Sequence, residues 1–138
     1  MFQVDISKEQ GNVPVTVMKL TGQLDGQSYQ ELIAKAQETH KGGAKNILLD
    51  MGELTYISSA GLVALHTIAL LMRGDQLPDP EQGWAALKSI DRSRSSGLQK
   101  GVKLFNLRPA VINVLDMVGY TAIFEVFSDK QKALESFS

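Results

Sequence analysis

The chain has 138 residues, of which 43% are hydrophobic and 21% are charged, and its formal net charge is −1 at pH 7. This length fits one domain with a sizeable core, and the near-neutral charge argues against a nucleic-acid-binding protein, which normally presents a basic face. The absence of cysteine excludes a disulfide framework, a thiol nucleophile and a thiolate metal site.

Segments with strand periodicity and segments with helix periodicity alternate along the chain. Strands are predicted where apolar and polar residues alternate or where aliphatic residues are consecutive, and helices where apolar residues recur every three or four positions. In chain order we expect strands at 2–6 and 13–20, a helix at 27–40, a strand at 45–50, a helix at 59–73, a strand at 102–106, a helix at 109–119, a strand at 122–127 and a closing helix capped by Ser128-Asp129. This order predicts one α/β domain over residues 1–138.

Residues from about 74 to 100 do not follow this alternation. They include Pro78, Pro80, Gly83 and a serine- and arginine-rich tract at 92–97, all of which favour a loop. Connections of this length are uncommon in compact domains, and long loops close at little extra entropic cost. We therefore expect a flexible surface insertion. Because it follows the helix at 59–73 directly, a second interpretation is that it screens or extends a docking surface.

No apolar stretch approaches the roughly 20 residues that a membrane-spanning helix needs. The N-terminus also lacks the basic and apolar regions of a signal peptide. Together with the absence of cysteine, these features lead us to expect a cytoplasmic protein without membrane insertion.

Two serines, Ser58 and Ser59, stand where the strand at 45–50 gives way, through a polar loop, to the helix at 59–73. A serine at a helix start can accept a hydrogen bond from one of the unpaired backbone N–H groups. The same position suits a phosphate, because the helix N-terminus carries a partial positive charge. The hydroxyl is therefore a structural cap, a phosphorylation switch or a nucleophile.

Catalysis by these serines is poorly supported by the rest of the sequence. His66 lies seven residues after Ser59, roughly 10 Å along the same helix, and His40 ends a different helix. A Gly-x-Ser-x-Gly elbow, a phosphate-binding loop and a dinucleotide fingerprint are all missing, and the acidic residues are scattered rather than clustered as metal ligands. We expect no catalytic residue, no cofactor and no metal, and a small esterase is kept only as a third interpretation.

A phosphoserine at this helix start is compatible with a binding switch. It would add a charge of about −1.5 to −2, partly stabilised by the helix dipole and the unpaired amides. The fold would hardly change, but the surface around Ser59 would change sign. A partner that docks over the helix start would then gain or lose affinity.

Five segments, taken in order, resemble a STAS domain, the family of bacterial anti-sigma factor antagonists and of cytoplasmic modules of sulfate transporters. They are Leu20 to Asp25, Ile47 to Asp50, Tyr56 to Leu62, Leu104 to Pro109 with Val114 to Gly119, and Phe127 to Leu134. The resemblance covers nearly the whole chain except the insertion. It implies a STAS fold with a mixed sheet of four to five strands and helices packed mainly on one face.

The resemblance also implies a modification site. Antagonists of this family commonly carry the motif Asp-Ser-Ser/Thr-Gly-Leu, in which the first serine is phosphorylated. Aligning on Gly61-Leu62 places Ser59 at the phosphorylated position, Ser58 at the aspartate and Ala60 at the second Ser/Thr. The aspartate is thus replaced, and Ser58 is the second choice for the phosphorylated residue.

A non-enzymatic, anti-sigma factor antagonist-like regulator of bacterial transcription is the function that the resemblance implies. It would bind a serine-kinase anti-sigma factor, be reset by a PP2C-type phosphatase, and exist as a monomer or weak dimer. The expected partner-binding residues are Asp25, Ser58, Ser59, Ala60, Gly61 and Leu62. Asp25 has a second interpretation as a cap of the helix at 27–40. The alternative function, favoured by the replaced aspartate and the insertion, is a non-phosphorylated STAS scaffold or a lipid-transport accessory subunit.

Overall fold

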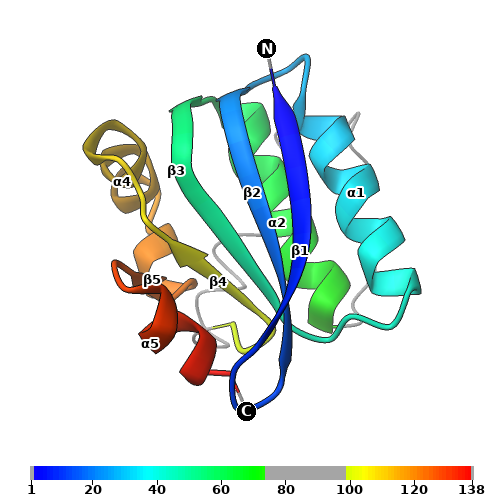
Figure 1. The fold of residues 1–138 in the computed structure, drawn as a ribbon. Coiled ribbons are helices and arrows are strands. Elements are labelled where there is room, and N and C mark those ends of the chain that lie inside the picture. The colour runs from blue at the N-terminus through cyan, green and yellow to red at the C-terminus, as the bar shows by residue number, and fades with distance from the viewer. Residues whose placement is uncertain (1, 74–98, 138) are drawn as a thin grey trace.

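The computed structural model describes residues 2–73 and 99–137, and these residues form a five-stranded sheet in the order β1-β2-β3-β4-β5 (Figure 1). The strands are β1 (Gln3–Gln10), β2 (Pro14–Leu24), β3 (Ile47–Ile57), β4 (Val102–Phe105) and β5 (Val126–Phe127). β1 pairs with β2 in an antiparallel hairpin, and every later pair of neighbours is parallel. The mixed sheet is confirmed.

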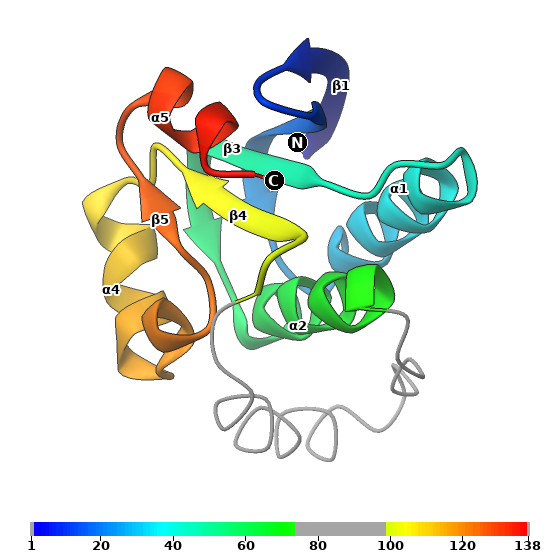
Figure 2. The ribbon, with the colours of Figure 1, turned by 90° about the horizontal axis from the view of Figure 1, so that it is seen from below.

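Four helices and a short 3₁₀ turn accompany the sheet in the described residues. They are α1 (Tyr29–Lys41), α2 (Ser59–Arg73), α4 (Pro109–Met117), η2 (Tyr120–Ala122) and α5 (Lys130–Glu135). Viewed along the sheet, α1, α2 and α4 lie on one face and α5 lies on the other (Figure 2). The prediction that helices pack mainly on one face is therefore confirmed. None of these helices is both long and apolar enough to cross a membrane.

The strand periodicity of β2 divides the core into two clusters. Met18 and Leu20 point toward α1 and α2 and join the larger cluster, whereas Val15 and Val17 point to the opposite face, because successive side chains of a strand alternate. The smaller cluster consists of Val15, Val17, Leu48, Ala133, Leu134 and Phe137. It forms the floor on which α5 packs.

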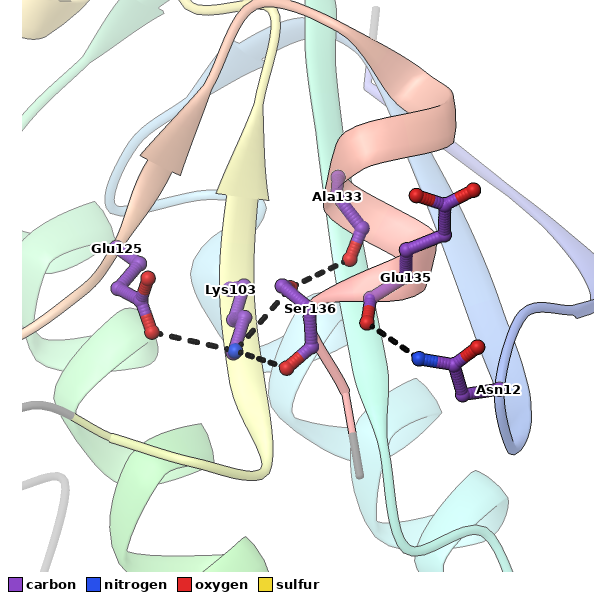
Figure 3. A network of polar contacts seen from close by, with 6 residues as sticks. All are labelled: Asn12, Lys103, Glu125, Ala133, Glu135 and Ser136. Atoms are coloured by element: carbon purple, nitrogen blue, oxygen red, sulfur yellow. Dashed lines mark hydrogen bonds and ion pairs between the residues drawn. The ribbon is translucent and has the colours of Figure 1, made fainter.

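A buried lysine fastens α5 to the sheet (Figure 3). Lys103 in β4 is only 5% exposed, and its ammonium donates to the carbonyl and the hydroxyl of Ser136 over 3.0 and 3.1 Å. It also pairs with Glu125 at 3.2 Å and lies 4.9 Å from the ring centroid of Phe137. The cation thus satisfies a carbonyl at the end of α5, while Asp129 caps its start by accepting the Lys132 N–H at 3.2 Å, as predicted.

β3 is much longer than expected. The sequence predicted a strand that ends at Asp50 and a polar loop after it, but the strand continues to Ile57. Its later residues Met51, Leu54 and Ile57 are buried at a spacing of three, and its register with β2 shifts twice. Irregular pairing of this kind destroys the two-residue period that identifies a strand, which is why the prediction was wrong here.

Other element boundaries also differ from the predictions. β1 extends to Gln10, and α1 begins at Tyr29 rather than at residue 27. Most of the strand expected at 122–127 is absent: Gly119, at φ 80°, turns the chain into η2, and Val126–Phe127 alone pairs with β4. The cause is packing, since Tyr120, Ile123 and Phe124 all turn into the core.

The insertion expected at about 74–100 lies, apart from its last two residues, outside the described residues. Gln99 is buried, and its N–H donates to the carbonyl of Ile123 over 2.7 Å. The chain is therefore fixed to the domain again before β4 begins.

Candidate functional site at the starts of α1 and α2

The parallel pairing of β2 and β3 brings two of the predicted site segments together. Strands that run in the same direction end at the same edge of a sheet, so the helices that follow them begin side by side. The Ser58 N–H donates to the carbonyl of Leu24 over 2.9 Å, which joins the end of β2 to the start of α2. Asp25 therefore lies next to the Ser58-Ser59 junction, as the predicted contact surface requires.

Ser58 is the N-cap of α2. Its carbonyl accepts the first helical hydrogen bond, from the Leu62 N–H at 3.0 Å, and its hydroxyl oxygen accepts the Gly61 N–H at 3.4 Å. The side chain is half-buried. The capping role left open for the two serines thus belongs to Ser58.

Ser59 occupies the first helical position and is exposed. Within residues 2–73 and 99–137, no hydrogen bond of its hydroxyl is recorded. The first turn of α2 contains no acidic residue, so the partial positive charge of the helix start is not offset by a side chain of that turn. Ser59 therefore presents an accessible hydroxyl at an electrostatically suitable place for an added anion.

The residues after Ser59 turn away from the surface. Ala60 is half-buried, Gly61 is buried, and Leu62 belongs to the main core. A Cβ at Gly61 would lie 2.6 Å from Ile57 Cγ1 and 2.8 Å from the Leu24 carbonyl oxygen. Gly61 and Leu62 therefore support the start of α2 from inside the domain, and their part in partner binding stays a prediction.

Asp25 is engaged in a turn that introduces α1. Its carboxylate accepts the Gln27 N–H at 3.0 Å, and its own N–H donates to the hydroxyl of Ser28, also at 3.0 Å. Ser28 in turn donates to the Gln23 carbonyl at 2.8 Å. Asp25 thus stabilises the turn before α1. This role is similar to the helix cap that was its second interpretation. Asp25 itself is half-buried, and it directly follows Leu24, whose carbonyl accepts the Ser58 N–H.

Two side chains that lie near the starts of α1 and α2 were not identified from the sequence. Ser28 is 8% exposed and fixes the turn before α1, and the spacing Asp-x-x-Ser was the available signal for it. Tyr56, two residues before Ser58, is 51% exposed. It could not be identified from sequence because the segment was predicted as loop, where exposure is ordinary.

The rest of α2 is a rigid support for its first residue. All nine residues from Gly61 to Ala69 are buried, and the Tyr120 hydroxyl donates to the Leu62 carbonyl. His66 is 1% exposed, and burial, followed by the positive charge of Arg73, lowers its pKa below the ordinary value of 6.5. A buried imidazole two turns along the helix has no path to the exposed Ser59 hydroxyl.

The described residues offer no metal centre, since no group of three His, Asp or Glu side chains in them is arranged to hold an ion. The site at the edge of the sheet is therefore an exposed hydroxyl at the start of a fixed helix, with Asp25 next to Leu24 at the end of β2 and the exposed Tyr56 near the end of β3.

Comparison with known proteins identifies the family and the fold of the chain. Residues 7–78, just over half of the chain, match the family model described as Mlab, STAS domain. BtrV of Bordetella bronchiseptica, by its name a candidate anti-sigma factor antagonist, is 25% identical over 118 residues, which are 86% of this chain and 82% of BtrV.

Solved structures with a similar fold include two proteins from bacteria. An anti-sigma factor antagonist from Mycobacterium paratuberculosis matches with a TM-score of 0.67 and 14% identity, over 97% of this chain and 92% of that chain. The Bacillus cell fate determinant SpoIIAA in its phosphorylated form matches with a TM-score of 0.51 and 16% identity, over 98% and 97%. The chain belongs to the STAS domain family.

Proposed function

We propose that this protein is a non-enzymatic regulator of the anti-sigma factor antagonist type, whose binding to a protein partner is controlled by phosphorylation of Ser59. The observation that carries the proposal is the exposed Ser59 hydroxyl at the start of a helix whose residues Gly61 to Ala69 are all buried. A kinase can reach this hydroxyl without unfolding any part of the domain. Ser58 is the second choice, because its half-buried hydroxyl already caps α2.

The physical effect of phosphorylation at Ser59 would be local. A charge of about −1.5 to −2 would appear beside the helix start, where the dipole contributes about 0.3–1 kcal/mol of stabilisation to an anion. Since Gly61 to Ala69 are buried, α2 has no room to move in response. The partner would therefore sense a change of surface charge and shape rather than a change of fold.

The replaced aspartate of the family motif is compatible with this proposal. Aspartate and serine are both preferred N-cap residues, and Ser58 performs the capping that a carboxylate would perform there. The substitution removes one negative charge next to Ser59, and Asp25 supplies the neighbouring carboxylate at this edge. Kinase recognition in this protein would then depend on the turn before α1 as well as on α2.

The relatives support a protein partner. BtrV carries an anti-sigma factor antagonist name, and SpoIIAA has been solved in a phosphorylated form. By the same reasoning we place a serine-kinase anti-sigma factor as the partner and a PP2C-type phosphatase as the enzyme that reverses the modification. Because such a kinase requires ATP, we propose that phosphorylation and dephosphorylation take place in the cytoplasm.

The test combines phosphorylation and binding. The protein, Ser59→Ala and Ser58→Ala are incubated with candidate serine-kinase anti-sigma factors and ATP, and intact masses are measured. One added phosphate is expected on the protein and on Ser58→Ala but none on Ser59→Ala. In calorimetry, Ser59→Glu should bind the same partner at least ten-fold more weakly at an unchanged melting temperature. Phosphate on Ser59→Ala, or equal affinity of Ser59→Glu, would contradict the proposal.

A second function, a STAS scaffold that is not phosphorylated, such as a lipid-transport accessory subunit, is favoured by two observations. The matching family model is described as Mlab, STAS domain, and the motif aspartate is replaced by Ser58. This alternative predicts a partner recovered equally by the protein, Ser59→Ala and Ser59→Glu, with no phosphate on any of the three.

A further inference from the structure

The two edges of the sheet are protected to very different degrees. β5 is a two-residue strand, whereas β1 has eight residues and stands at the opposite end of the strand order (Figure 1). The register of β1 with β2 runs without a shift from Gln3 to Gln10, and β1 contains no proline. Short strands, bulges, prolines and charged side chains are the usual devices that block an edge. β1 is long and has no bulge or proline, so its protection is limited to the charged residues Asp5, Lys8 and Glu9.

The backbone groups on the outer side of β1 can be identified from its neighbours. The Thr16 N–H of β2 donates over 2.9 Å to the backbone carbonyl of Asn46, which lies on the β3 side of β2. This N–H therefore points away from β1. Thr16 is paired with Lys8, which makes this a pair without hydrogen bonds. Such pairs alternate along an antiparallel ladder. Val4, Ile6 and Lys8 therefore direct their N–H and C=O groups outward.

Ile6 stands in the middle of this outward-facing series and is 45% exposed. It also lines an open groove of about 590 Å³ between the β1–β2 hairpin and the end of α1. Among residues 2–73 and 99–137, no strand pairs with the outer side of β1. An exposed isoleucine on such an edge favours addition of another strand.

The sequence of β1 fits a second copy of itself. Antiparallel pairing about a two-fold axis at Ile6 places outward-facing residues opposite each other, as hydrogen bonding requires. The pairs are Ile6 with Ile6, Val4 with Lys8, Asp5 with Ser7 and Gln3 with Glu9. No two like charges stand directly opposite each other, and the two exposed isoleucines cover one another.

The neighbouring registers are worse. An axis at Val4 pairs only three residues of β1, which begins at Gln3, against seven for the axis at Ile6. An axis at Asp5 places two aspartates opposite each other, an axis at Ser7 places Asp5 opposite Glu9, and an axis at Lys8 opposes two lysines. Like charges at these positions destabilise a strand pair. We propose that β1 pairs antiparallel with β1 of a second copy of this chain about a two-fold axis at Ile6, which makes the two five-stranded sheets continuous.

This pairing does not depend on the proposed switch. The axis passes through β1 at the border of the sheet, whereas Ser59 begins α2, which follows the end of β3 in the middle of the sheet. The dimer would present two copies of the Ser59 surface. Its existence can be tested without any kinase or partner.

Disulfide trapping tests the register directly, because the chain has no cysteine of its own. In the proposed pair the two Cα atoms of Ile6→Cys lie about 5.5 Å apart, within the range of a disulfide. The control Gln10→Cys lies on the same strand, but its two copies would be roughly 27 Å apart. Under mild oxidation, Ile6→Cys should form covalent dimers at least ten-fold faster. Equal rates would overturn the proposal.

Sedimentation provides the second measurement. The protein should show a concentration-dependent monomer–dimer equilibrium, and Ile6→Pro should remain monomeric. The Ile6 N–H points outward, so proline there removes an intermolecular donor without removing a bond to β2. Dimers of Ile6→Pro as abundant as those of the protein would overturn the proposal, as would an unmodified protein that stays monomeric while Ile6→Cys fails to cross-link. In that last case the outer edge of β1 would be available for an extended segment of another protein. If Ile6→Pro does not fold, the two cysteine variants decide.

Discussion

The starts of α1 and α2 lie at the same edge of the sheet, and each contains a serine close to the first helical residue, yet the two serines differ completely in their contacts. Ser28 is buried and bonded to Gln23 and Asp25. Ser59 is exposed, with no side-chain bond recorded among the described residues. The difference shows that a serine at a helix start is available for chemistry only when another residue has already satisfied the helix.

The cause lies in the length of chain between strand and helix. Four residues separate β2 from α1, which is enough for a turn in which Asp25 and Ser28 bond each other. A single residue, Ser58, separates β3 from α2, and it is used as the cap. No turn remains into which Ser59 could fold back, so its side chain faces solvent.

Gly61→Ala should have the largest effect, because it moves the start of α2 itself. The added Cβ would lie 2.6 Å from Ile57 Cγ1 and 2.8 Å from the backbone oxygen of Leu24, and overpacking of this kind costs about 2 kcal/mol. Gly26→Ala is the matched control in the α1 turn, since nothing lies within 4 Å of its Cβ. Urea unfolding of both variants checks the prediction, which is wrong if they lose equal stability.

Ser28→Ala should destabilise the α1 start by about 1 kcal/mol, because the partly buried Asp25 N–H and Gln23 carbonyl lose their partner. Phosphorylation at Ser59 should be unaffected, as the two turns are held independently. Chemical denaturation measures the loss of stability, and an unchanged stability of Ser28→Ala would contradict the role given to Ser28. Loss of Ser59 phosphorylation in a folded Ser28→Ala would show that the two turns are not independent.

The middle of α2 should make stability depend on pH. Burial lowers the pKa of His66 below 6.5, so the unfolded chain binds more protons than the folded one between that lowered pKa and 6.5. The free energy of unfolding should therefore fall as the pH drops below about 6.5, by no more than about 1.4 kcal/mol per pH unit. NMR titration of His66 in His40→Gln, which retains one imidazole, provides the check. A midpoint at or above 6.5 would refute the burial argument.

The smallest effects are expected at the two serines of the site, and their order is informative. Ser58→Ala should cost about 0.5 kcal/mol, at the low end for an N-cap because its bond to Gly61 is long. Ser59→Ala should change stability by less than about 0.5 kcal/mol. Thermal melts of the two single variants measure this directly. A larger loss for Ser59→Ala would mean that its hydroxyl has a structural partner and is not available.

The sequence predicted the elements that local residue patterns determine, and it missed the features that depend on pairing between strands. Helices α2 and α4, the presence of strands β1 and β2, and the Asp129 cap follow from periodicity and capping residues. The second half of β3 could not be predicted, because its bulges depend on the partner strand. Serines at a helix start were found, but the assignment of Ser58 as cap and Ser59 as exposed required the helix boundary to within one residue.

The attachment of α5 has a consequence for how the domain opens. The larger cluster involves three helices and the whole sheet, whereas α5 is held by the smaller cluster and by the Lys103 ammonium. A six-residue helix held in this way is a candidate for sub-global unfolding well below the global free energy. Its amides should be the first helical ones to exchange with deuterium, and each opening would bare Val15, Val17 and Leu48 to solvent.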